Sequence, residues 1–276
     1  MIQRWQRVRP QGRTLFLCAC ACLLALPAQA CEQVAGSMHM GSRYLMESAW
    51  TEYASSGKAL VREQGTLAGS TLEAGLACGP WSLSASIFTN TGVRAYAGQT
   101  SFGSALATHS QIDMQASSIS LGWDYTDSFQ WVVDASQQHL ARQIVGTATV
   151  AGYPETYDRE LLRMGARWGM ASELGRWTLI GMVSVGGAQS MRLQLPGKDA
   201  TALRFDAPRQ WDVGMEWRRD LNQSLYLQAA YHYIATSVEQ SPYAIVTSGG
   251  SPVAVAYQPQ TQTVDQPLTV SLGLRF

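Results

Sequence analysis

The chain has 276 residues, of which 14% are charged, with 20 basic and 20 acidic side chains and a mean hydropathy of −0.08. The first thirty residues hold four arginines and no acid, so the remainder has 16 basic and 20 acidic residues and a net charge of −4. This balance excludes the basic footprint of a nucleic-acid-binding protein. Few charges without a long apolar run are instead typical of an alternating membrane barrel.

The N-terminus has the three parts of an export signal. Arginines at 4, 7, 9 and 13 precede a short apolar core from Leu15 to Leu26, and Ala28-Gln29-Ala30 forms an A-x-A cleavage site. That core is too short to span a bilayer as a helix. We therefore predict a secretory signal peptide over residues 1–30, cleaved after Ala30.

Two cysteines remain after cleavage, because Cys18, Cys20 and Cys22 leave with the signal. In an exported and oxidising setting, an even pair predicts a disulfide between Cys31 and Cys78. The alternative is acylation of Cys31 as in a lipoprotein, although the three residues before it do not resemble a lipobox.

Strands with a period of two dominate the mature chain. Residues 31–42 are polar and predict a periplasmic lead-in, and residues 43–276 predict one barrel domain. Trp81, Leu83, Ala85 and Ile87, for example, alternate with serines. About ten such strands are expected, or twelve if a hairpin at 244–255 is counted. Short connections are expected at 78–80, 126–128, 172–176 and 220–223, and long ones at 97–114, 145–158, 194–206 and 241–265.

The last nine residues, Leu268 to Phe276, alternate and end on an aromatic. This segment resembles the closing strand of Gram-negative outer-membrane β-barrels. The resemblance implies an all-β fold, a transmembrane antiparallel up-and-down barrel, among outer-membrane lipids and lipopolysaccharide. It also implies that Gly273, Leu274 and Phe276 form a signal for the barrel-assembly machinery. A soluble β-sandwich, the main alternative, leaves the terminal Phe276 unexplained.

Tryptophans lie beside the short connections, on the face expected to be apolar. A flat amphipathic ring prefers the headgroup boundary, so these residues predict an aromatic girdle at the periplasmic side. The five residues are Trp81, Trp123, Trp131, Trp177 and Trp217.

Charged side chains fall on the face expected to line the lumen. A barrel of about ten strands is narrow, so opposite charges should pair across it. The predicted network is Glu47, Glu73, Asp124, Asp134, Arg163, Arg167, Asp212, Glu216, Arg218, His232 and Arg275. Because the last strand closes against the first, Arg275 is expected near Glu47. The alternative is a narrow passage for small solutes.

Catalytic and metal-binding motifs are weak. An omptin-like protease would need a His–Asp pair near the outer rim, and neither His139 nor His232 has an Asp two residues away. A lipid hydrolase would need Ser and His within hydrogen-bond reach. Met38-His39-Met40 contains copper-ligand types, but on a short polar segment. We therefore predict a protein without catalytic residues, cofactor or metal, present as a monomer.

A second resemblance concerns the late strands. The stretch from Gly214 through Glu216-Trp217-Arg218 to Leu225-Tyr226-Leu227 is similar to autotransporter translocator domains, which carry a large passenger. Without a passenger in this chain, the favoured functions are a narrow porin-like passage or a structural or surface-interaction barrel.

Overall fold

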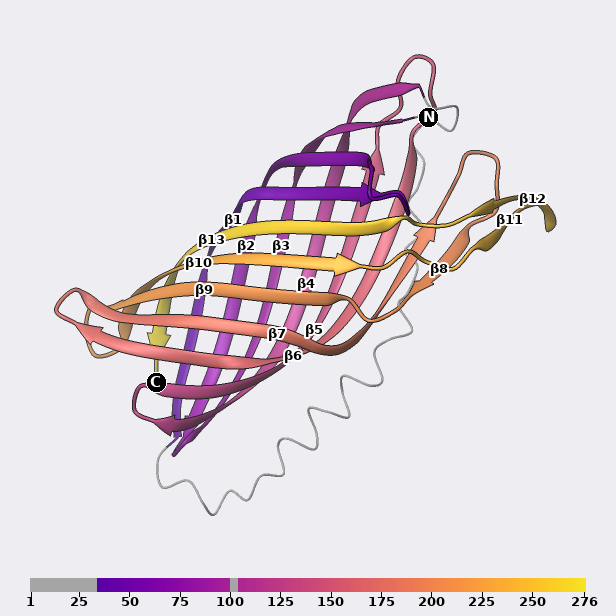
Figure 1. Cartoon of the computed structure of the whole chain (residues 1–276). Helices are drawn as coiled ribbons and strands as arrows, with labels where there is room; N and C mark the ends of the chain where they lie inside the picture. Colours follow the sequence, from indigo (N-terminus) through magenta and orange to yellow (C-terminus); the bar gives the residue numbers. More distant parts are fainter. Residues whose placement is uncertain (1–33, 100–103) are drawn as a thin grey trace.

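The computed structural model describes residues 34–99 and 104–276, and these residues form strands and connecting turns (Figure 1). No helix among them is long and apolar enough to cross a membrane. The predicted signal peptide and Cys31 lie outside the described residues.

Within the described ranges, ten antiparallel strands follow one another around a closed barrel. They are β1 (Val34–Tyr53), β2 (Ala59–Cys78), β3 (Trp81–Gln99), β4 (Ala105–Thr126), β5 (Phe129–Ile144), β6 (Tyr153–Ser172), β7 (Gly175–Leu193), β9 (Arg209–Asp220), β10 (Leu225–Val238) and β13 (Gln260–Arg275). The predicted barrel of about ten strands is thereby confirmed.

The last strand closes the barrel against the first, as predicted. β13 pairs with β1 from Ser37 opposite Arg275 to Tyr53 opposite Gln260. At the end of this ladder, the backbones of Gly36 and Phe276 exchange two hydrogen bonds of 2.8 and 3.0 Å. The terminal residue therefore contributes to closure and is not a loose tail.

Three further strands lie near the outer rim. β8 (Thr201–Phe205) pairs with the end of β7, and Pro208 separates it from β9. Proline has no N–H to give to the ladder. At this point the Ser184 hydroxyl donates to the Pro208 carbonyl and accepts from the Gln210 N–H. β11 (Ala244–Ser248) and β12 (Ser251–Ala256) form the predicted hairpin.

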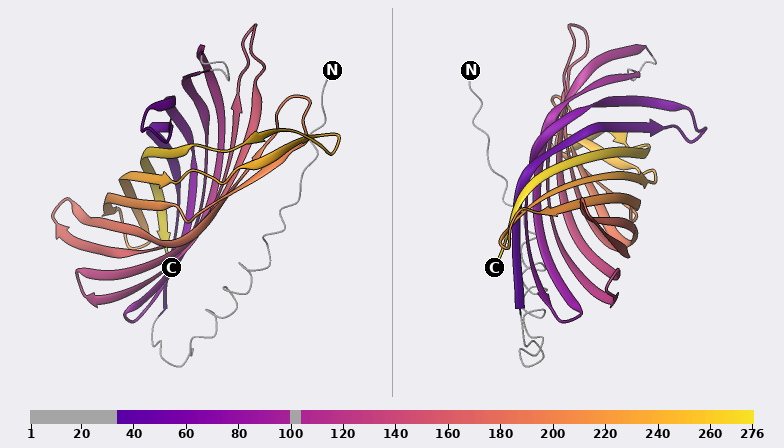
Figure 2. Two further views of the ribbon diagram at one scale, coloured as in Figure 1. Left: turned by 45° about the vertical axis from the view of Figure 1, so that its right-hand side comes forward. Right: turned by 90° about the vertical axis from the view of Figure 1, so that its left-hand side faces the viewer.

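Most of the strands are much longer than a membrane requires. β1 to β7 have 16–22 residues, whereas about 9–11 suffice to span a bilayer. The long loop expected at 97–114 is therefore wrong, since β3 and β4 run through most of that segment, and the loop expected at 145–158 is shorter than predicted, because β6 already begins at Tyr153. Figure 2 shows these strands continuing past the middle of the barrel toward the end that carries the β11–β12 hairpin.

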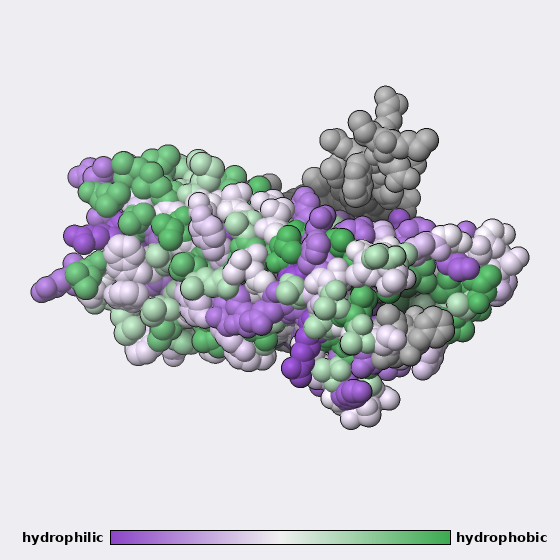
Figure 3. All heavy atoms as spheres, turned by 90° about the horizontal axis from the view of Figure 1, so that it is seen from above, coloured by the Kyte–Doolittle hydropathy of each residue, from purple (hydrophilic) through white to green (hydrophobic). Residues whose placement is uncertain are grey.

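In the long strands the polarity inverts along the strand, as β4 shows. In β4, Ile119, Leu121 and Trp123 face outward near the periplasmic turn, with serines inside. Nearer the outer rim the outward residues are polar, and Ile112 and Met114 face inward at 3% and 4% exposure. The barrel is thus apolar outside in its membrane half and apolar inside in its outer half. In the space-filling view, apolar side chains are frequent over the half that carries the periplasmic turns, at the left (Figure 3).

The predicted lead-in at 31–42 is also wrong in its boundary, because β1 already begins at Val34. Val34 pairs with Cys78, which lies at the end of β2. The disulfide from Cys31 to Cys78 stays a prediction; mass spectrometry of the unreduced mature protein would disprove it by finding both thiols free.

The five predicted girdle tryptophans form two rows on the outer face. Trp81, Trp123 and Trp131 are direct cross-strand partners, and Trp177 is the partner of Trp217. Neighbouring rings lie 6.3 Å apart for the 81–123 pair and 6.4 Å apart for the 177–217 pair. Their depth at the headgroup boundary stays a prediction.

Candidate functional site

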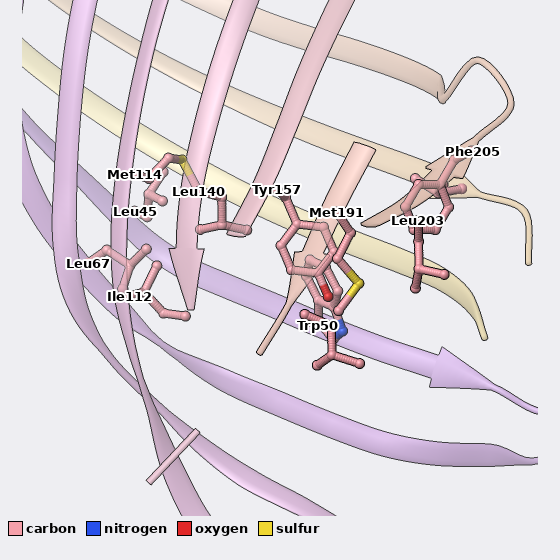
Figure 4. Packing of buried hydrophobic residues seen from close by; sticks show 12 residues of the cluster. Leu45, Trp50, Leu67, Ile112, Met114, Leu140, Tyr157, Met191, Leu203 and Phe205 are labelled. Carbon is pink, nitrogen blue, oxygen red and sulfur yellow. The ribbon is translucent and has the colours of Figure 1, made fainter. Parts of the chain in front are cut away.

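The outer half of the barrel is filled by an apolar plug. Inward side chains from strands all around the ring pack into one buried cluster (Figure 4). The cluster contains Leu45, Trp50, Leu67, Ile112, Met114, Leu140, Tyr157, Met191, Leu193, Leu203, Phe205 and Val238. A small barrel can be filled by its own side chains in this way.

One contact in the plug joins opposite walls. Trp50 lies on β1 and Tyr157 on β6, which are five strands apart in either direction around the ring. Their rings nevertheless meet edge to face with centroids 5.1 Å apart (Figure 4). Such a contact leaves no room for a water-filled channel between the two walls at this level.

Arg142 on β5 is the ionic centre of the plug. Its guanidinium donates to Glu155 on β6 at 2.5 Å, to Glu63 on β2 at 2.7 Å and to Glu52 on β1 at 3.2 Å. The Arg142 side chain is only 1% exposed, and it also lies 5.0 Å from the Trp50 ring. Burying this charge is tolerable only because carboxylates surround it.

A second buried arginine, Arg94 on β3, lies beside this centre. It donates to Ser48 at 2.5 Å and lies 3.9 Å from both Asp265 and Glu63. Arg94 and Arg142 together thus face four acids. These are Glu52, Glu63, Glu155 and Asp265. Burial raises the pKa of Glu155, against the opposing effect of Arg142.

The membrane half of the lumen holds the predicted charges in pairs. Arg163 donates to Asp134 at 2.5 Å and lies 3.7 Å from Asp212. Asp212 also contacts His232 at 2.8 Å, and Asp134 accepts a hydrogen bond from Ser120. These four predicted network residues are therefore brought together across β5, β6, β9 and β10.

A second group lines the periplasmic end. Arg218 lies 3.7 Å above the Tyr226 ring, Arg275 pairs with Asp220, and the Tyr226 hydroxyl contacts His39 at 3.2 Å. Two further predicted residues lie nearby: Glu73 is 3.7 Å from His39, and Asp124 accepts from Gln130.

Glu47 is the exception among the predicted lumen residues, because it faces outward. A β-bulge between Leu45 and Ser48 shifts the alternation, so Leu45 and Ser48 are both buried inside. Glu47 instead accepts hydrogen bonds from Gln64 and Gln266 on the outer face. The predicted approach of Arg275 to Glu47 is wrong for the same reason.

Two polar cavities, of about 230 and 440 Å³, lie in the lumen below the plug. The larger one reaches the periplasmic turn at 126–129. Six residues line both cavities and so form a neck between them: His39, Glu73, Ser84, Arg167, Glu216 and Gln228. Arg167 and Glu216 are the two predicted network residues that make no hydrogen bond or ion pair within the described part of the chain.

Two His–Asp pairs escaped the sequence analysis, since each partner lies on a neighbouring strand. His232 contacts Asp212 inside the lumen, and His139 contacts Asp158 at 2.7 Å on the outer face. Outside the membrane-spanning part, the hydrogen bond to Asp158 raises the pKa of His139.

The Met38-His39-Met40 segment does not converge on one point. The alternation of β1 turns Met38 and Met40 outward, at 42% and 68% exposure, while His39 faces the lumen. A metal ion cannot meet all three side chains in this strand conformation.

The β11–β12 hairpin projects from the outer end of the barrel (Figure 1), and hydrogen bonds to Asp199 brace it. Asp199 accepts from the Thr247 hydroxyl at 2.6 Å and from the Gly250 N–H at 3.0 Å, which lowers the pKa of Asp199. Val246 is buried beneath the hairpin, whereas Ile245 and Val255 remain 64% and 63% exposed.

The plug residues were not predicted from the sequence, because the apolar alternation that marks the strands belongs to their outward face. The strand alternation nevertheless indicates two of their neighbours. Arg142 is an even number of residues from Asp134 on β5, and Glu63 is an even number of residues from Glu73 on β2, so each falls on the lumen-facing side of its strand. Extending each inward face beyond the membrane half would have found both residues.

No family model matches the chain, and no curated protein does. Solved structures with similar folds include outer-membrane proteins. The outer membrane protease OmpT from Escherichia coli aligns with a TM-score of 0.58 at 9% identity, over 89% of this chain and 97% of its own. The translocator domain of the autotransporter NalP from Neisseria meningitidis has a TM-score of 0.45 at 12% identity, over 95% and 96%. The outer membrane protein OprG from Pseudomonas aeruginosa has a TM-score of 0.35 at 9% identity, over 90% and 98%. The closed ring of ten antiparallel strands and its likeness to OmpT together show that the chain has the fold of a transmembrane outer-membrane β-barrel.

Proposed function

We propose that this protein is a non-enzymatic outer-membrane barrel whose lumen is closed, and which acts through its outer surface. The contact between Trp50 and Tyr157 carries this proposal, because it joins opposite walls of the ring. The Arg142 centre, which links β5 to β1, β2 and β6, supports it at the same level. A permanently open porin-like passage is disfavoured by both.

Planar-bilayer conductance of the refolded mature protein tests the closed state. The wild type should be silent, whereas Trp50→Ala/Tyr157→Ala should give discrete current steps. Trp211→Ala/Tyr233→Ala is the matched control, since these rings also lie 5.1 Å apart but stack on the outer face.

Heat-modifiable migration on a gel should confirm folding of each variant before conductance is measured. Regular current steps from the wild type would overturn the closed-lumen proposal. A silent Trp50→Ala/Tyr157→Ala variant that folds would show that the aromatic contact is not what closes the lumen.

The surface role rests on the braced hairpin. Exposed apolar side chains on a structured outer element are typical of an interaction site. Tyr243, Ile245 and Val255 are each more than 60% exposed. The hairpin that presents them is fixed by two hydrogen bonds: the Thr247 hydroxyl donates to the Asp199 carboxylate, and the Asp199 N–H donates to the Thr247 carbonyl. We therefore expect an apolar partner surface at this hairpin.

Retention of cells on polystyrene gives a simple probe of that expectation. Cells carrying the wild type should be retained more than cells carrying Ile245→Ser/Val255→Ser, at equal amounts of folded protein. Val133→Ser/Val183→Ser changes two valines of the apolar band that are 47% and 50% exposed, and serves as a control expected to leave retention unchanged. Equal retention by the wild type and the hairpin variant would contradict the surface role.

A further inference from the structure

The neck between the two lumen cavities carries a cation, Arg167, and an anion, Glu216, that make no ion pair within the described residues, and Glu73 lies within electrostatic range of both. Arg167 comes from β6 and Glu216 from β9, with β7 between them. Arg167 pairs with Ile180 and Glu216 with Thr178 in the strand register, so the two residues lie close in height on one wall. Neither makes an ion pair with a described residue, and the Arg167 Nε is buried without a hydrogen-bond partner.

The other described lumen charges nearby differ in this respect. Arg163 has Asp134 and Asp212, and Arg275 has Asp220. Glu73 on β2 lies 3.7 Å from His39, its cross-strand neighbour on β1. A charge in a narrow lumen without a partner is unfavourable unless water or a ligand compensates it. The two opposite charges face the same space, whose adjoining cavities measure about 230 and 440 Å³.

We propose that this neck binds a small zwitterion of the amino-acid class, entering from the periplasmic side. Its carboxylate meets the guanidinium of Arg167, and its ammonium group meets the carboxylate of Glu216. Ser84 and Gln228, which line the same neck, supply neutral hydrogen-bonding groups. Entry is from the periplasm because the larger cavity reaches the 126–129 turn, whereas the plug closes the outer end.

The test uses the refolded full mature protein in detergent and isothermal titration calorimetry. The probes are ω-amino acids of increasing chain length, each compared with the alkylamine and the alkyl carboxylate of the same length. We expect binding of the amino acids with a clear optimum of length, set by the spacing of the two charges. The single-charge probes should bind at least about tenfold more weakly, since each lacks one charge-assisted contact.

Variants assign the binding to the neck. Arg167→Gln and Glu216→Gln should each weaken the best probe by about tenfold or more, and Arg167→Lys should retain most of the affinity. Arg209→Gln is the control, because Arg209 pairs with Glu239 at the exposed rim. The proposal is overturned if carboxylates bind as well as amino acids, if no probe binds, or if affinity is independent of length. These wild-type comparisons decide the matter even if a neck variant fails to fold.

Discussion

Arg142→Ala is the most informative perturbation of the plug. The substitution removes the shared partner of Glu52, Glu63 and Glu155, whose side chains are 10%, 0% and 4% exposed. It also removes the guanidinium that lies 5.0 Å from the Trp50 ring. Three buried acids would then repel one another without a central cation, so the outer half of the barrel should lose stability.

The magnitude follows from burial. Removing one partner of a buried ion pair costs about 3–5 kcal/mol, because the remaining charge stays buried without compensation. Arg209→Ala is the matched control: its pair with Glu239 has the same N–O distance as the Arg142–Glu52 pair, 3.2 Å, but the side chains are 84% and 63% exposed. We expect less than about 1 kcal/mol there.

Urea unfolding in lipid vesicles, followed by tryptophan fluorescence and by heat-modifiable gel migration, measures both losses. Adding Glu63→Gln to Arg142→Ala removes one of the stranded charges and should recover part of the lost stability, a non-additive result for residues in contact. Equal losses for the Arg142 and Arg209 variants would refute the reasoning, as would a further loss from the added Glu63→Gln.

Two further predictions concern other parts of the barrel. Because the hydrogen bond to Asp158 raises the pKa of His139 above about 6.5, its stabilisation should be complete below that pH and disappear as the pH rises through the raised value. NMR titration should show the pKa of His139 falling in Asp158→Asn, and an unchanged pKa would rule out the pairing. A Cβ at position 273 would overlap the Tyr226 ring, so Gly273→Ala should cost about 1–3 kcal/mol by overpacking. The same change should be nearly neutral in a Tyr226→Ala background; an equal loss there would show that the ring is not the cause.

The membrane half of the barrel was predictable because lipid imposes one rule on it. Each spanning strand must present apolar side chains outward at every second residue, and Trp123, Leu121 and Ile119 follow that rule in sequence. The outer half of the barrel is surrounded by water but filled by its own apolar side chains, so the rule reverses there. Apolar residues such as Ile112 and Met114 then face the lumen, whereas Ile119 and Leu121 of the same strand face outward, so the apolar alternation of the membrane half does not continue to them.

The sequence by itself determined the barrel, its closing strand and the parity of most lumen charges, since these depend on local alternation and on the lipid that surrounds it. Only the tertiary structure decided which charges meet. Arg142 finds its partners on β1, β2 and β6, and Trp50 meets Tyr157 across the whole ring. Such contacts depend on strand shear and on the bulge that turns Glu47 outward. The closed outer half follows from that geometry, because side chains that are distant in sequence must converge to fill it.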